Sequence, residues 1–81
     1  MKDLTKDEEE KLNAIMDKLE REALNYYYKR SGAFANAEAW NYDDEFIDIE
    51  LKYGIQDGEE DSEHTENHKV VRNTMTLTDD Y

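Results

Sequence analysis

The chain contains no cysteine, no proline and only three glycines among its 81 residues. Without cysteine it has no disulfide and no thiolate to hold a metal ion or act as a nucleophile. Leu, Ile, Val and Phe together number 14 of 81. Such a low content of large apolar residues, combined with high net charge, is typical of disordered chains. Six tyrosines, three methionines, two phenylalanines and one tryptophan can still build a small aromatic-rich core. We therefore expect a single, marginally stable domain, for which a homodimer is one way to complete the core.

Long apolar runs are also lacking. No stretch approaches the roughly 18 apolar residues of a membrane span, and the first ten residues lack the apolar segment of a signal peptide. We therefore expect a cytoplasmic protein, in the host cell's cytoplasm if it is encoded by a phage. Because an acidic surface repels phosphate, direct binding to nucleic acid or to an anionic membrane is disfavoured, and a basic protein surface is the expected partner.

Acidic charge is concentrated in one part of the chain. Asp and Glu number 22 against 10 Lys and Arg, a net charge of −12, and residues 38–81 carry −11 of it. Residues 43–66 hold eleven acids and one base, Lys52. The usual explanation of such a run is a solvated face or a disordered acidic loop. The alternative is a partner-binding acidic face, whose candidate residues are Asp43, Asp44, Glu45, Asp48, Glu50, Asp57, Glu59, Glu60, Asp61 and Glu63.

The pattern of residues 46–55 favours an ordered face. Apolar side chains occupy every second position from Ile47 to Ile55, while Asp48, Glu50 and Lys52 occupy the alternate positions. This alternation predicts a half-buried strand. Carboxylates two residues apart on a strand are about 6.8 Å apart, close to the roughly 6–7 Å between successive phosphates along a DNA strand. Charges at this spacing can imitate a row of phosphates.

The N-terminal part predicts a long amphipathic helix over about residues 6–30. Thr5 and Glu8 match a capping box, and Arg30 followed by Gly32 provides a helix stop. Apolar residues recur at three- and four-residue steps, and a stripe of this length can also bind another chain. The residues of this candidate helix interface are Leu12, Ile15, Leu19 and Tyr27.

The remaining segments predict an α+β fold. Residues 33–40 are rich in alanine and favour a short second helix, although strand alternation fits as well. Residues 56–68 are polar throughout and predict a loop that is free to move. Residues 69–78 are rich in β-branched residues and predict a second strand, with Val71 directed inward. The strands at 46–55 and 69–78 would form a small antiparallel sheet or hairpin covered by the helix.

Motifs that carry chemistry are weak. His64 and His68 could share a zinc ion on a helix, but the metalloprotease pattern is not met and no third ligand has a recognisable spacing. The acids around Gly58 do not fit a calcium-binding loop, and residues 26–28 present at most two of their three tyrosines on one helix face. We expect no metal, no cofactor and no catalysis.

In its size, its acidity and its lack of cysteine and proline, the chain resembles the broad class of DNA-mimic proteins of phages and mobile elements. This class includes inhibitors of restriction enzymes, of CRISPR effectors and of uracil-DNA glycosylase, and no sequence motif carries the likeness. The resemblance implies a non-enzymatic inhibitor that occupies the nucleic-acid-binding groove of a host defence or repair protein. The alternative is an acidic interaction module or regulatory subunit that docks through its N-terminal helix.

Overall fold

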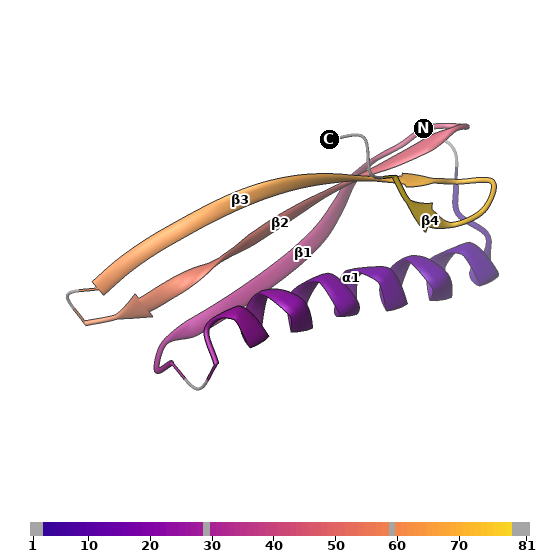
Figure 1. The fold of residues 1–81 in the computed structure, drawn as a ribbon. Helices are drawn as coiled ribbons and strands as arrows, with labels where there is room; N and C mark the ends of the chain where they lie inside the picture. Colours follow the sequence, from indigo (N-terminus) through magenta and orange to yellow (C-terminus); the bar gives the residue numbers. More distant parts are fainter. Residues whose placement is uncertain (1–2, 29, 59, 79–81) are drawn as a thin grey trace.

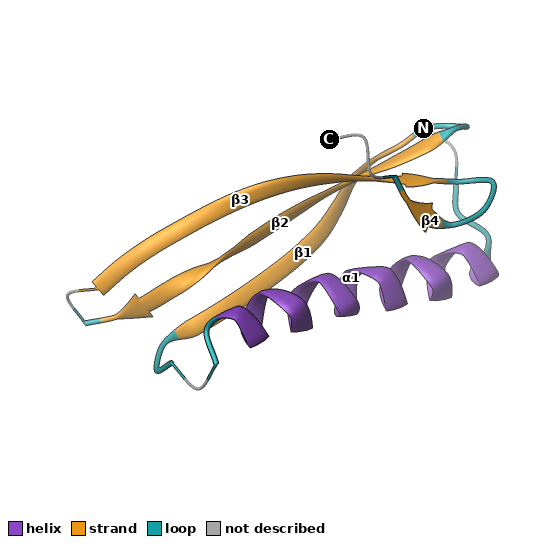
Figure 2. Ribbon diagram, in the orientation of Figure 1, coloured by secondary structure: helices purple, strands orange, loops and turns teal. Residues whose placement is uncertain are grey.

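The protein, described by a computed structural model over residues 3–28, 30–58 and 60–78, is one helix packed on an antiparallel sheet (Figures 1 and 2). The sheet runs in chain order β1-β2-β3-β4, so each strand lies beside the one that precedes it. This architecture confirms the α+β class. The elements are α1 (Lys6–Tyr26), β1 (Ala33–Tyr42), β2 (Phe46–Asp57), β3 (Glu60–Val71) and β4 (Thr76–Leu77).

Helix α1 begins where the sequence predicts and ends earlier. The Glu8 N–H donates to Thr5 Oγ1 at 3.1 Å and the Thr5 N–H donates to Glu8 Oε1 at 3.0 Å, which completes the capping box. The helix ends at Tyr26 instead of residue 30. Tyr27 leaves the helix at φ −96° and ψ 27°, and its ring centroid lies 6.2 Å from that of Tyr53. Gly32, with φ +78°, belongs to the turn into β1.

Residues 33–40 do not form the short helix that their alanine content favours; they form most of β1, as the alternative prediction from strand alternation has it. Alanine has a high helix propensity, but here tertiary packing overrides it. The alanines at 33, 35, 37 and 39 pair with the inward row of β2 and so face α1. Their small side chains let the helix approach the sheet closely, and Glu20 Oε2 accepts a hydrogen bond from the Ala37 N–H at 2.8 Å.

The loop expected over residues 56–68 is also replaced by regular structure. Strand β2 contains the predicted 46–55 strand and continues to Asp57; the chain turns at Gly58, with φ +60°, and β3 begins at Glu60. The strands pair without a bulge from Phe46 opposite Val71 to Asp57 opposite Glu60. The strand expected over 69–78 divides into the end of β3, a turn and the two-residue β4, and Val70, rather than Val71, is fully buried.

The core lies between α1 and the first two strands. Helix α1 packs on β1 and β2, whereas β3 lies on the far side of β2 from the helix (Figure 1). The buried apolar cluster consists of Leu12, Leu19, Ala23, Ile47, Ile49, Leu51 and Val70. In the part of the chain that the structure describes, nothing covers the opposite side of the sheet (Figure 2). Of the described residues, no helical stretch has both the length and the apolarity needed to cross a membrane.

Arg72 joins three segments that are distant in sequence. Its guanidinium donates to both carboxylate oxygens of Glu8, from Nε at 2.9 Å and from Nη2 at 3.1 Å. It also donates to the carbonyl oxygens of Asp43 and Asp3. These hydrogen bonds lower the pKa of Glu8 to about 2 and raise the pKa of Arg72. The start of α1, the β1–β2 turn and the β3–β4 turn are therefore held together at one end of the molecule.

Candidate acidic interface

The side of the sheet that faces away from α1, hereafter the outer face, carries a mixed but mainly acidic surface. Successive side chains of a strand point to opposite faces, and the strand register then assigns each residue to a side. Acids outnumber lysines on this face by five to two. Its charged residues are Glu38 on β1, Asp48, Glu50 and Lys52 on β2, and Asp61, Glu63 and Lys69 on β3.

Two carboxylates on this face oppose each other directly. Glu38 and Glu50 are partners in the β1–β2 register, an arrangement of like charges that destabilises a sheet. Lys52 partly neutralises the pair, because its Nζ lies 3.6 Å from Glu50 Oε1. The neighbouring Asp48 accepts a hydrogen bond from Asn41 Nδ2 at 2.9 Å. The centre of the outer face therefore holds three carboxylates on two paired strands, and two of them, Asp48 and Glu50, contact neighbouring side chains.

The candidate acidic residues do not all share one face. The structure places Asp48, Glu50, Asp61 and Glu63 on the outer face. Residues 43–45 lie instead in the β1–β2 turn, at the Arg72 end of the molecule. Asp57 lies at the opposite end, on the helix side of β2 by strand alternation.

Of the two remaining candidates, Glu59 lies outside the described residues, and Glu60 is the first residue of β3.

The candidate helix interface is largely used inside the molecule. Leu12 and Leu19 are 2% and 6% exposed in the core, and Ile15 packs against that core. Tyr27 is half-buried, and its ring centroid lies 5.0 Å from that of Tyr26 and 6.2 Å from that of Tyr53. A partner could reach the two leucines only if α1 left the sheet.

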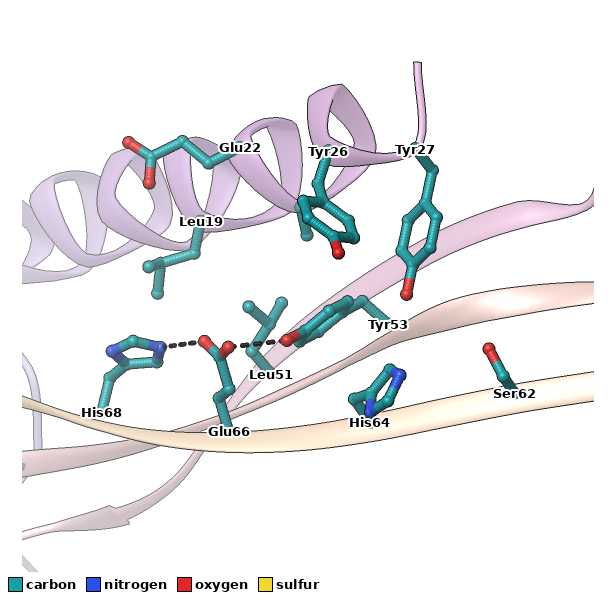
Figure 3. A pocket seen from close by; sticks show the side chains of 11 residues that line it. Leu19, Glu22, Tyr26, Tyr27, Leu51, Tyr53, Ser62, His64, Glu66 and His68 are labelled. Carbon is teal, nitrogen blue, oxygen red and sulfur yellow. Dashed lines mark hydrogen bonds and ion pairs between the residues drawn. The ribbon is translucent and has the colours of Figure 1, made fainter. Parts of the chain in front are cut away.

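A groove of about 560 Å³ lies between the C-terminal half of α1 and the helix-facing side of β3 (Figure 3). The Tyr53 hydroxyl donates to Glu66 Oε2 at 2.7 Å, and His68 Nε2 lies 3.1 Å from Glu66 Oε1. The Tyr53 hydrogen bond lowers the pKa of Glu66, and, together with burial, the same hydrogen bond raises the pKa of Tyr53 to about 12. His64 lies beside Tyr53, with ring centroids 5.5 Å apart.

The groove does not bring the two histidines together for a metal ion. On a strand, residues four apart are roughly 14 Å from each other, so His64 and His68 on β3 are too distant to share one zinc ion. Within the described ranges, no group of three or more His, Cys, Asp or Glu side chains could hold a metal ion. The spacing that would suit zinc on a helix loses that meaning on a strand.

Two residues of the candidate interface were not predicted from the sequence. Glu38 lies outside the acidic run and joins it only through the β1–β2 register. Trp40 lies at the register shift between Ala39 and Asn41 and is 58% exposed, although an aromatic residue in an alanine-rich segment suggests core packing. Alternation along residues 33–40 was the one sequence signal that could have found both.

Comparison of the chain with protein-family models, with curated proteins and with solved structures gave no match.

Proposed function

We propose that this protein is a non-enzymatic acidic inhibitor that binds the nucleic-acid-binding groove of a basic protein and competes with DNA or RNA for it. Its targets would be host defence or repair proteins, as for anti-restriction and anti-CRISPR proteins of phages, and its site of action would be the cytoplasm. The proposal rests chiefly on one observation: Glu38 and Glu50 stand directly opposite each other on an uncovered face.

This pair contributes nothing favourable to the fold that would account for it. Like charges opposite each other in a sheet repel, and a chain with net charge −12 already carries self-repulsion. A basic groove would relieve the repulsion when it binds, because its lysines and arginines would lie against the carboxylates. Acidic charge on the partner-binding face would also increase the association rate through long-range steering.

The arrangement of the outer face supports the same proposal. Asp48 and Glu50 are two residues apart on β2, at a spacing of about 6.8 Å, and Asp61 and Glu63 repeat it on β3. The exposed Trp40 lies at the bulge in β1, next along the strand to Asn41, which pairs with Asp48. Tryptophan is one of the residue types that most often dominate binding energy at protein interfaces.

A competition experiment tests the proposal. The protein is immobilised, exposed to a nuclease-treated bacterial lysate, and washed with an excess of double-stranded DNA. We expect DNA to release the captured proteins, and we expect the triple variant Glu38→Gln, Asp48→Asn and Glu50→Gln to capture few of them. A matched control changes the same number of charges on α1, with Glu9→Gln, Glu10→Gln and Asp17→Asn. Captured proteins that remain bound in excess DNA would contradict the proposal.

A further inference from the structure

Strand β3 has an open edge along most of its length. Strand β4 pairs only with Val70 and Val71, and from Asp61 to His68 no described strand lies on that side. The Thr78 N–H donates to the Lys69 carbonyl, which shows that the odd-numbered residues of β3 direct their backbone groups toward this edge. Thr65 therefore presents its N–H and C=O outward, at the centre of the open segment.

The groove described above runs beside this edge (Figure 3). Its β3 wall is polar, formed by Ser62, His64, Glu66 and His68. The opposite wall carries Glu22 and Tyr26 of α1 and Tyr27, the residue that follows the helix. Two carboxylates and three tyrosine rings, counting Tyr53, thus line one concave surface. Carboxylates attract a cationic side chain, and the face of a tyrosine ring binds a lysine or arginine through a cation–π interaction.

Charge decides which kind of strand fits the edge. An open edge invites pairing with another strand, and acidic side chains discourage pairing with a like-charged one. A second copy of this chain would bring another net charge of −12 to the same place. An extended basic segment would instead meet Glu66 and Glu22 on the groove side and Asp61 and Glu63 on the outer side.

We infer that the open edge of β3 is a strand-addition site for an extended basic segment of a partner protein, with alternate lysine or arginine side chains lying in the groove beside α1. Main-chain hydrogen bonds to the odd-numbered residues of β3 hold the segment, and the groove selects its side chains. Of the charged residues of the outer face, the site uses only Asp61 and Glu63, and it does not depend on competition with nucleic acid.

The first test uses a short synthetic peptide of alternating lysine and threonine, with a peptide of alternating glutamate and threonine as control. Hydrogen exchange of the full chain is followed by NMR. The lysine peptide should slow exchange of the Asp61, Glu63, Thr65 and Asn67 amides and shift the Tyr53 ring signals, whereas the glutamate peptide should do neither. The inference is overturned if the lysine peptide leaves these amides unprotected. It is also overturned if the amides are already protected without peptide and sedimentation shows that the chain is a dimer.

A pair of variants separates strand addition from simple charge attraction. Thr65→Pro removes an N–H that faces the open edge, a position where an edge strand tolerates proline, while Thr65→Val keeps the N–H. We expect Thr65→Pro to weaken binding of the lysine peptide about tenfold or more and Thr65→Val to bind normally. Equal binding by both variants would overturn the inference. If Thr65→Pro does not fold, a lysine peptide methylated at alternate backbone nitrogens tests the same bonds on the unmodified chain.

Discussion

Replacing Glu38 by glutamine should stabilise the protein, because it removes one of two carboxylates that face each other across β1 and β2. Two unit charges about 6 Å apart in a water-like dielectric repel by about 0.7 kcal/mol. Lys52, 3.6 Å from Glu50, offsets part of this repulsion. We expect a net gain of about 0.5 kcal/mol, within the range measured for cross-strand pairs, which corresponds to a Tm increase of about 2–4 °C for a domain of this size.

Thermal unfolding followed by circular dichroism measures this gain, at low salt and again in about 1 M salt, where the screening length of about 3 Å is shorter than the separation of the charges. The gain should disappear at high salt. Glu63→Gln is the matched control, because Glu63 lies on the same face but opposite Gly54, so no carboxylate opposes it. Equal stabilisation by Glu38→Gln and Glu63→Gln at low salt, or a gain that persists at high salt, would show that Glu38 and Glu50 do not repel each other measurably.

Three further predictions concern the fold. The lowered pKa of Glu8, about 2 against the ordinary 4.5, contributes stability above pH 4.5 that is lost as the pH falls toward 2; Glu8→Gln should flatten this acid-side loss in denaturant titrations. The pKa of Tyr53, raised to about 12, contributes stability below pH 10 that is lost as the pH rises toward 12, so Tyr53→Phe should flatten the alkaline loss and remove the latest step of the tyrosinate absorbance titration. Gly54→Ala should destabilise the β2–β3 hairpin, because a Cβ there would lie 1.8 Å from the Ser62 carbonyl oxygen; cooperative unfolding at unchanged denaturant midpoint would contradict this.

The elements with strong local signals were predictable from the sequence. Thr5 and Glu8 identify the start of α1 through a reciprocal pair of hydrogen bonds that depends on four consecutive residues alone. The strand at 46–55 was equally clear, because β2 is covered by α1 on one side only and therefore alternates between apolar and polar residues.

The elements that depend on tertiary context were not predictable. Alanines in β1 signal a helix by propensity, but they are small because α1 packs on them. Strand β3 looks like a loop because α1 does not cover it, so most of its positions face water and carry polar side chains. Arg72 is an ordinary basic residue in the sequence, and its role depends on partners 64 and 69 residues away.

The candidate site, too, was predictable in part: the sequence shows which residues are acidic, and the tertiary structure decides which of them lie together. The acidic run predicted where the carboxylates are in the sequence, but the strand register decides which of them share a face, and it adds Glu38 while placing Asp57 on the other side. The groove beside β3 escaped prediction because the positions of Tyr53, Glu66 and His68 only converge once β2 and β3 pair.

The most direct test of the central claim is the effect of excess double-stranded DNA on the proteins captured by the immobilised chain and by its outer-face variant Glu38→Gln, Asp48→Asn and Glu50→Gln. We expect DNA to release what the unmodified chain captures, the outer-face variant to capture little, and the α1 control variant to capture normally. Capture that is indifferent to DNA, or equal for all three proteins, would contradict the central claim.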